Sequence, residues 1–275
     1  MAIGIGPLLF DTLETGLKED CPYGDITTEL LNIEGLGHFQ FISRVDAIVS
    51  GTERLSDFFR SKHLEVISSQ RPGTAIKKGD ILIEAKGDIK TMFKCWRICQ
   101  TYLTILCAIA TQTGKVVSAA KKANKDIQIV VACRKAHLGM RLDEIEAVQD
   151  GGAIYHRNSL SDTILITQNH LRTVGTLPDK LYSMQHKIEL EPTSEAEAYQ
   201  YAKSVDIILL DHFEPHQLQT IVTKLKASNP SLQVGVAGGV NLGNVSDYAV
   251  FVDIIVLSSV LYAAPLDITC KIHKF

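Results

Sequence analysis

The sequence predicts a two-domain α/β protein, with a strand-rich first domain and a second domain in which parallel strands alternate with helices. Residues 37–50 carry alternating apolar side chains, and residues 71–83 combine apolar residues with Gly-containing turns, which is typical of short strands. Residues 92–122 contain no Pro and one Gly, and their apolar residues recur three and four positions apart, as in a long helix or a helix pair. From residue 127 onward, short β-branched runs alternate with segments of helical periodicity.

The first domain begins with a predicted helix over residues 3–19. Its apolar residues form one stripe, which is interrupted by the turn-forming segment Cys21–Asp25. Short strands are expected within residues 37–50 and at 81–83, where apolar residues are bounded by Gly-containing turns. The helix over residues 92–122 then bridges the two halves of the chain.

The second domain is predicted as a barrel of parallel strands. Near-continuous apolar strands indicate a sheet covered on both faces, and about six or seven strand-helix units in roughly 150 residues favour a closed barrel over an open sheet. The domains are expected to span residues 1–110, including the bridging helix, and residues 111–275. The runs predicted as barrel strands are residues 127–132, 164–166, 188–190, 207–210, 234–236 and 254–257.

The charge balance argues against polyanionic partners. The chain has 28 basic and 31 acidic side chains and a net charge of -3, so no general attraction to nucleic acid or to an anionic membrane surface is expected. The apolar residues 3–10 lack the preceding basic residues of a signal peptide. No uncharged apolar run approaches the ~20 residues that cross a bilayer. Six scattered cysteines without a CxxC pair suit a reducing compartment, so we expect a cytoplasmic protein.

Some residues that can bind metals have a simpler structural interpretation. Cys95 and Cys99 share one face of a helix and could hold a metal, but no His or Cys pair lies nearby, which favours small core residues. His170, His212 and His216 lack the partner spacing of a zinc site, and His212 and His216 are expected on the loop and helix after a strand. Trp96 is expected to pack at a domain or subunit contact.

Polar side chains follow nearly every predicted barrel strand, at the end where such barrels carry their chemistry. Arg134, Lys135 and Arg157 could converge on one anion, where each charge-assisted hydrogen bond contributes roughly 1.5–3 kcal/mol. Glu191 and Asp211 end successive strands, and their carboxylates suit a magnesium ion held together with substrate phosphates.

Small residues follow the last two strands. Gly238 and Gly239 allow backbone N–H groups to approach a phosphate, and Ser258 and Ser259 add hydroxyl or amide donors. Each strand-end feature also has a simpler explanation, since Arg-Lys pairs are common on surfaces, Gly-Gly is often only a turn, and an acidic residue is often a helix N-cap. Their placement at consecutive strand ends favours one site for a phosphorylated substrate with magnesium.

Ordered motifs along nearly the whole chain resemble those of quinolinate phosphoribosyltransferases, also called nicotinate-nucleotide pyrophosphorylases. The final barrel strand, Val256–Ser259, and the following Tyr262, where the family usually has His, are similar to the ModD branch, pyrophosphorylases associated with molybdenum transport. The motifs that carry the resemblance are Gly24–Thr28, Arg134–Arg141, Gly151–Arg157, Asn169–His170, Ile188–Glu191, Leu210–Asp211, Gly238–Asn241 and Pro265–Ile268.

The resemblance implies an N-terminal open-faced α/β sandwich domain, a C-terminal incomplete (β/α) barrel, and a homodimer in which the first domain of one subunit covers the barrel of the other. It also implies a magnesium-dependent glycosyltransferase of the pentosyltransferase class (EC 2.4.2.-). Such an enzyme transfers phosphoribose from phosphoribosyl pyrophosphate to a pyridine carboxylate or related anionic acceptor and releases pyrophosphate.

The same resemblance assigns roles to individual residues. Lys135, Glu191 and Asp211 are expected to be catalytic, with the two carboxylates also on the magnesium side. The residues expected to bind the acceptor are Arg134, Lys135, His156 and Arg157, with Arg97 contributed by the other subunit. The residues expected to bind the 5′-phosphate are Gly238, Gly239, Ser258 and Ser259.

Thr167 is a departure within the predicted acceptor site, because the family usually carries Lys there. Loss of one cationic contact costs about 1.5–3 kcal/mol, or ten- to hundred-fold in binding a dianion, so the acceptor stays open. A second hypothesis is a non-catalytic barrel that binds phosphate or an oxyanion in connection with molybdenum transport. Glu191 and Asp211 favour the enzyme, since a pure anion binder gains nothing from carboxylates in its site.

Overall fold

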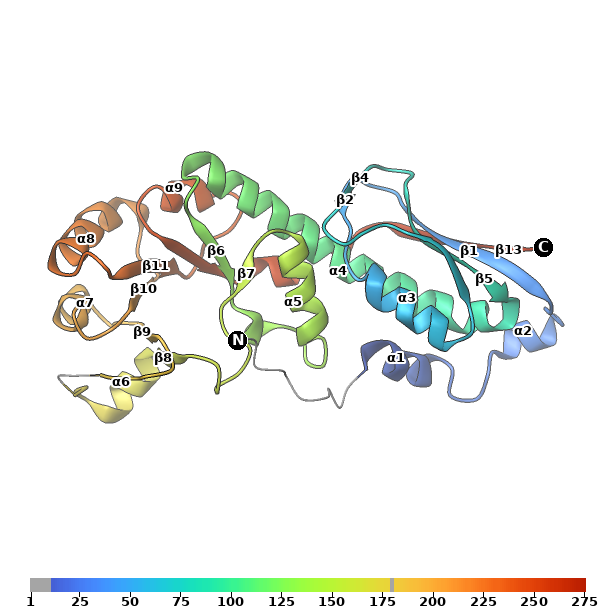
Figure 1. Cartoon of the computed structure of the whole chain (residues 1–275), viewed down its shortest axis with the longest axis horizontal. Coiled ribbons are helices and arrows are strands. Elements are labelled where there is room, and N and C mark those ends of the chain that lie inside the picture. The colour runs from blue at the N-terminus through green and yellow to red at the C-terminus, as the bar shows by residue number, and fades with distance from the viewer. Residues whose placement is uncertain (1–10, 179–180) are drawn as a thin grey trace. The chain divides into compact units, whose positions relative to one another are not determined.

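A computed structural model describes residues 11–178 and 181–275, which divide into two compact units (Figure 1). Unit 1 comprises the described part of Met1–Gln112 together with His137–Gly151 and Ala263–Phe275. Unit 2 comprises Thr113–Ala136 and the described part of Gly152–Tyr262. The predicted boundary between residues 110 and 111 lies close to the break after Gln112, whereas the two later segments of unit 1 are absent from the predicted division.

Unit 1 is built on a four-stranded antiparallel sheet with strand order β13-β1-β5-β3. Strand β13 runs beside β1 along its whole length, from the pair Ser43 and Ile268 to the pair Gly37 and Lys274, which is why the end of the chain belongs to this unit. A two-residue ladder joins β2 to β4. The strands are β1 (Leu36–Ser43), β2 (Ala47–Ile48), β3 (Glu65–Ser69), β4 (Ala75–Ile76), β5 (Ile81–Asp88) and β13 (Ile268–Lys274).

The two faces of this sheet differ in polarity. Phe39 and Phe41 alternate toward a fully buried face, where Phe59 of helix α3 (Thr52–Ser61) packs with its ring centroid 4.9 Å from that of Phe39. On the opposite face, Glu84 accepts hydrogen bonds, including one of 2.9 Å from the Gln40 amide. A sheet with helices on one face and polar side chains on the other is open-faced, which confirms the predicted first-domain fold.

Helix α4 (Ile89–Ala123) is one continuous helix, where the sequence allowed one helix or a pair. Among the described residues it alone is long and apolar enough to cross a membrane, but 56% of its most apolar window is buried inside the protein. Its Cys95 and Cys99 side chains are buried, and burial raises the pKa of the Cys95 thiol to about 11. These residues have the environment of a core helix, as predicted for the two cysteines.

The other helices of unit 1 are α1 (Thr12–Asp20), α2 (Ile26–Leu30) and α5 (Arg141–Asp150). Asp11 is the N-cap of helix α1, and its carboxylate accepts hydrogen bonds from the backbone N–H groups of Leu13 and Glu14. The part of this helix that was predicted over residues 3–10 lies outside the described residues.

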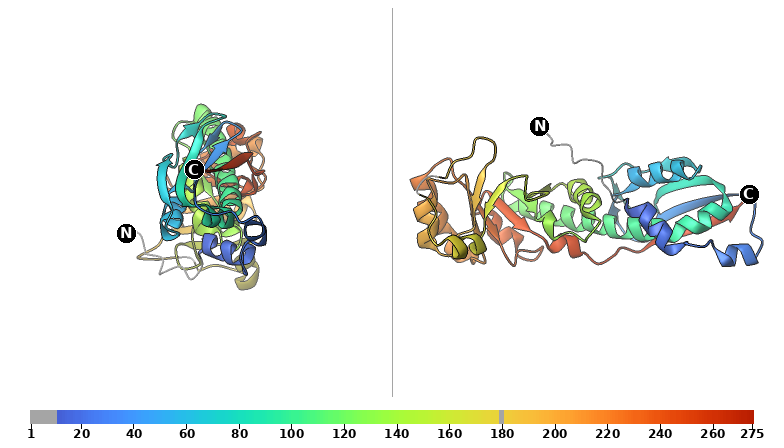
Figure 2. Two further views of the ribbon diagram at one scale, coloured as in Figure 1. Left: turned by 90° about the vertical axis from the view of Figure 1, so that its right-hand side faces the viewer. Right: turned by 90° about the horizontal axis from the view of Figure 1, so that it is seen from below.

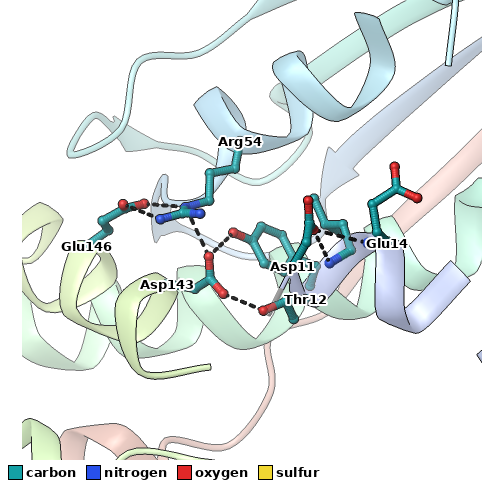
Figure 3. A network of polar contacts seen from close by, with 8 residues as sticks. Asp11, Thr12, Glu14, Arg54, Asp143 and Glu146 are labelled. Atoms are coloured by element: carbon teal, nitrogen blue, oxygen red, sulfur yellow. Dashed lines mark hydrogen bonds and ion pairs between the residues drawn. The ribbon is translucent and has the colours of Figure 1, made fainter. Parts of the chain in front are cut away.

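A polar network joins the helices of unit 1 (Figure 3). The buried carboxylate of Asp143 accepts hydrogen bonds from the hydroxyls of Thr12 and Tyr102, at 2.7 and 2.8 Å, and lies 3.0 Å from Nε of Arg54. Arg54 also donates two hydrogen bonds to Glu146. Helices α1, α3, α4 and α5 therefore share one buried polar centre.

Unit 2 contains a seven-stranded parallel sheet with order β7-β6-β12-β11-β10-β9-β8. Strands β7 and β8 follow each other in the chain but form opposite edges of the sheet, so the barrel is incomplete, as the family resemblance implied. Figures 1 and 2 show helices α6 (Gln168–Val174), α7 (Glu195–Tyr201) and α8 (Pro215–Ser228) on the outer side of the strands. The strands are β6 (Gln128–Val131), β7 (Ile154–Tyr155), β8 (Ile164–Ile166), β9 (Ile188–Leu190), β10 (Ile207–Asp211), β11 (Gln233–Ala237) and β12 (Ile254–Leu257).

The helices of unit 2 separate the successive strands from β8 to β12, and apolar strand residues fill the space inside the curved sheet. Val130, Leu209, Ile254 and Val256 form a buried cluster contributed by the three strands β6, β10 and β12. Two short 3₁₀ turns, η1 (Cys133–Lys135) and η2 (Ser259–Tyr262), follow β6 and β12. The helices are α6 (Gln168–Val174), α7 (Glu195–Tyr201), α8 (Pro215–Ser228) and α9 (Val245–Ala249).

Candidate functional site

A cavity of about 560 Å³ opens at the carboxyl ends of the strands of unit 2. Its walls come from residues within the carboxyl-terminal parts of β8, β10, β11 and β12 and from residues that follow β6, β7, β9, β10, β11 and β12, because parallel strands present these ends at one edge. Eight residues predicted for the site line this cavity: Lys135, His156, Glu191, Asp211, Gly238, Gly239, Ser258 and Ser259.

Two carboxylates face the cavity from neighbouring strands. Burial, together with the charges of Asp211 and Glu189, raises the pKa of Glu191. Within the described residues, the Glu191 carboxylate has no hydrogen-bond or ion-pair partner, and the nearest ion-pair atom to Asp211 is Nε2 of His212, at 3.8 Å. Negative charge is therefore concentrated at this wall without a protein counter-ion in contact.

The carboxylates of Glu191 and Asp211 fit a magnesium ion that takes few of its ligands from the protein. No cluster of three or more His, Cys, Asp and Glu side chains suited to a metal occurs in residues 11–178 and 181–275. Magnesium usually takes one or two carboxylates and completes its shell with water and substrate phosphates, and Glu191 with Asp211 meets that requirement.

The loop after β11 turns through two left-handed glycines, Gly238 (φ 81°) and Gly239 (φ 71°). A Cβ at Gly238 would lie 2.8 Å from Oδ1 of Asp211, so only glycine fits there, whereas the space beside Gly239 is open. The side-chain amides of Asn241 and Asn244 donate to the Gly239 carbonyl and hold the turn. In the part of the chain that the structure describes, the N–H groups of both glycines donate no hydrogen bond, which leaves them available to a ligand.

Lys135 is held at the cavity wall by its backbone. Its carbonyl accepts a 2.7 Å hydrogen bond from the hydroxyl of Tyr262, the residue that stands where the family usually has His. Ser259 makes only a long 3.4 Å hydrogen bond to the Val240 carbonyl. Tyr262 therefore links the turns that follow β6 and β12, and the Ser259 hydroxyl can reorient toward a ligand.

His156 is fixed by a buried acid that the sequence analysis did not assign to the site. Its Nε2 lies 2.5 Å from Oε2 of Glu189, and the two side chains are 15% and 7% exposed. Because a carboxylate oxygen accepts hydrogen bonds, the proton between these two atoms is carried by Nε2 of His156. A charged residue inside an otherwise apolar strand, Ile188–Leu190, is the signal that could have identified Glu189.

Arg157 is a buried guanidinium with no contacting counter-ion. It is 7% exposed, and burial, followed by the charge of Arg134, lowers its pKa. Among residues 11–178 and 181–275, no group forms a hydrogen bond or ion pair with this side chain. Buried cations are ordinarily paired, so Arg157 and its neighbour Arg134 have the electrostatics of a binding site for an anion.

Four predicted residues do not line the cavity: Arg134 and Arg157, which lie beside it in the chain, and Thr167 and Arg97. Thr167 is the N-cap of α6, where its N–H donates to Nδ1 of His170 at 3.0 Å and its hydroxyl lies 2.9 Å from the same nitrogen. Arg97 belongs to unit 1, is exposed, and places its guanidinium 3.9 Å from the ring centroid of Trp96. Trp96 therefore supports Arg97 through a cation–π contact.

His212 was expected only as a loop residue, and the structure places it in the cavity wall. Its position depends on contacts between β10 and β11 that the sequence does not display.

Comparison with known proteins agrees with this architecture. The family models described as the quinolinate phosphoribosyl transferase N-terminal and C-terminal domains match residues 25–107 and 109–271. A protein of Archaeoglobus fulgidus, provisionally named nicotinate-nucleotide pyrophosphorylase [carboxylating], is 30% identical over 91% of this chain and 99% of its own. A protein of Pasteurella multocida, provisionally named pyrophosphorylase ModD, is 31% identical over 95% and 96%.

Solved structures show the same fold. NadC from Streptococcus pyogenes has a TM-score of 0.83 at 24% identity and covers 96% of this chain and 97% of its own. The nicotinate-nucleotide pyrophosphorylase from Ehrlichia chaffeensis has a TM-score of 0.86 at 23% identity, with 95% and 97% covered. These likenesses confirm an open-faced domain combined with an incomplete barrel, and the two family models span most of the sequence. The chain therefore belongs to the quinolinate phosphoribosyltransferase family, enzymes of the pentosyltransferase class.

Proposed function

We propose that this enzyme transfers phosphoribose from phosphoribosyl pyrophosphate to a pyridine carboxylate or a related anionic acceptor, and releases pyrophosphate. One observation carries the proposal: a partly buried carboxylate, Glu191, lines the cavity, and a buried guanidinium, Arg157, directly follows the cavity-lining His156, and neither group contacts a counter-ion within the described residues. Folding tolerates such groups where a ligand supplies the missing charge.

The carboxylates suit the donor half of the reaction. As the bond from C1 of the ribose to the pyrophosphate oxygen breaks, positive charge develops on the ribose, and Glu191 and Asp211 stabilise that charge. Lys135 offsets negative charge on the departing pyrophosphate. The free N–H groups of Gly238 and Gly239 suit the 5′-phosphate, with Ser258 and Ser259 as further donors. Bound magnesium would neutralise the pyrophosphate, with Glu191 and Asp211 as its protein ligands.

The cations suit the acceptor half. Arg134 and Arg157 bind the carboxylate of the acceptor, and His156 adds a third donor as an imidazolium that donates through Nδ1–H while its Nε2–H is held by Glu189. The ring nitrogen of the acceptor is thereby oriented toward C1 and supplies the electron pair of the new bond. With quinolinate, loss of the 2-carboxylate as carbon dioxide would follow, helped by the positive ring nitrogen. Thr167 supplies no cation at this site, so an acceptor with fewer carboxylates than quinolinate fits the available charges better.

We further propose a cytoplasmic homodimer in which Arg97 of one subunit completes the acceptor site of the other. Its exposure and its support by Trp96 suit a residue that is presented to a partner surface. The ModD-type relative at 31% identity also makes a physiological link to molybdenum transport a proposal. A non-catalytic oxyanion-binding barrel is not favoured, because paired carboxylates at the cavity wall repel a simple oxyanion.

The test is pyrophosphate release from phosphoribosyl pyrophosphate with magnesium, measured across quinolinate, nicotinate and related acceptors. We expect turnover with at least one acceptor, and loss of turnover in Lys135→Ala with an unchanged melting temperature. Lys122→Ala is the matched control, because Lys122 is an exposed lysine near the end of α4. The proposal fails if no acceptor supports release and the protein does not bind phosphoribosyl pyrophosphate in calorimetry.

A further inference from the structure

His212 occupies a strained position at the edge of the cavity. It directly follows β10, and its φ of 61° places a residue with a Cβ in the left-handed region. Its N–H donates a 2.9 Å hydrogen bond to the carbonyl of Ala237, which fixes this backbone against β11. Strained backbone of this kind persists where the surrounding structure imposes it, and it is concentrated at functional sites.

The imidazole of His212 is held in place, and its two nitrogens remain available for hydrogen bonds. A Cβ at Gly238 would lie 2.7 Å from Cγ of His212, so the ring packs directly on the glycine backbone. The side chain is 74% exposed and lines the cavity. Its Nε2 is 3.8 Å from Oδ2 of Asp211, which is too far for a hydrogen bond. Within the described residues neither ring nitrogen has a hydrogen-bond partner.

The charges around the ring favour an anionic partner. The charged groups at this wall are the carboxylates of Asp211 and Glu191 and the ammonium of Lys135. An anionic ligand that approaches the two carboxylates needs hydrogen-bond donors beside them. The imidazole supplies one N–H when neutral and two when protonated, and it lies next to the Gly238–Gly239 turn, whose N–H groups are also free.

We propose that His212 donates a hydrogen bond to a phosphate oxygen of the phosphoribosyl donor, and so acts as a donor-binding residue alongside the Gly238–Gly239 turn. The inference rests on the proposed function, because it takes the ligand of this wall to be that donor. His212 acts on donor affinity and not on the acceptor, whose cationic contacts come from Arg134 and Arg157.

The test compares His212→Asn with the wild type by calorimetric titration of phosphoribosyl pyrophosphate and by steady-state kinetics. Asn tolerates left-handed backbone, so the fold is retained while the imidazole is lost. We expect the Kd and KM for the donor to rise about 10- to 100-fold, the value of one charge-assisted hydrogen bond, while the acceptor KM changes by less than about threefold. His216→Asn, at an exposed position of α8 outside the cavity, is the matched control and should bind the donor as the wild type does.

His212→Gly separates binding from backbone strain. Glycine relieves the left-handed conformation, so this variant should melt at or above the wild-type temperature and still lose donor affinity to the same extent. Donor binding by His212→Asn equal to that of the wild type, or a change confined to the acceptor KM, overturns the role of His212 alone. Failure of the wild type to bind the donor overturns both this role and the proposed function.

Discussion

Replacement of Glu191 by Gln should make the protein more stable and less active. The carboxylate is partly buried, has no hydrogen-bond partner among the described residues, and has a pKa raised by burial and by the charges of Asp211 and Glu189. A buried polar group without a partner costs about 1–3 kcal/mol. Because this group is only partly buried, we expect a gain of about 1 kcal/mol in the free energy of unfolding, or ~2–4 °C in Tm.

The gain should depend on pH with a definite sign. A raised carboxyl pKa means that the folded state binds the proton more readily than the unfolded state, so stability falls as pH rises from the ordinary value of 4.5 through the raised pKa of Glu191. Gln does not titrate. The advantage of Glu191→Gln should therefore be present at neutral pH and disappear near pH 4.

The activity should change in the opposite direction, because the carboxylate faces the charge that develops on the ribose. Loss of such a preorganised group lowers kcat by about 10²–10³-fold. Thermal melting from pH 4 to 8 and the pyrophosphate-release assay measure the two effects, with Glu195→Gln, an exposed acid on α7, as the control. A lower Tm for Glu191→Gln at neutral pH, or wild-type turnover, would refute the reasoning.

Three further substitutions test other parts of the molecule. Asp143→Ala removes the acceptor for the buried hydroxyl of Tyr102 in the network of Figure 3, and should cost about 1–3 kcal/mol in chemical unfolding; an unchanged denaturation midpoint contradicts this. Arg157→Leu removes a buried unpaired cation, so it should raise Tm and abolish acceptor binding in calorimetry; retained binding excludes Arg157 from the acceptor site. Thr167→Lys should lower the quinolinate KM about 10- to 100-fold, and an unchanged KM shows that residue 167 does not face the acceptor.

The barrel could be predicted from the sequence because its strands are buried on both faces. Runs such as Ile207–Leu210 and Ile254–Leu257 are continuous, apolar and β-branched, and the structure has β10 and β12 there. The two-residue β7 is too short to produce such a run. Strand β13 was not predicted, because its pairing with β1 joins residues more than 200 positions apart, and sequence periodicity does not identify a strand's partner.

The candidate site was predictable where a residue type indicates its own chemistry. Glu191, Asp211 and the Gly238–Gly239 pair follow predicted strands directly, so their convergence on one cavity required only the parallel-strand topology. The contribution of His212 could not be read in the same way, because it depends on the close approach of its ring to Gly238 across two strands. Residue spacing carries no information about that approach.

Glu189 explains how charges of both signs remain unpaired in one site. Its carboxylate is occupied by His156 at 2.5 Å, yet its charge favours the ionised form of Arg157 and opposes that of Glu191. Direct pairing of Arg157 with Glu191 would satisfy both groups and leave neither for a ligand. Glu189 holds His156, next to Arg157, at the end of β7, whereas Glu191 and Asp211 stand at the ends of β9 and β10. A transition state that joins an anionic acceptor to a positively charged ribose has this same distribution of charge.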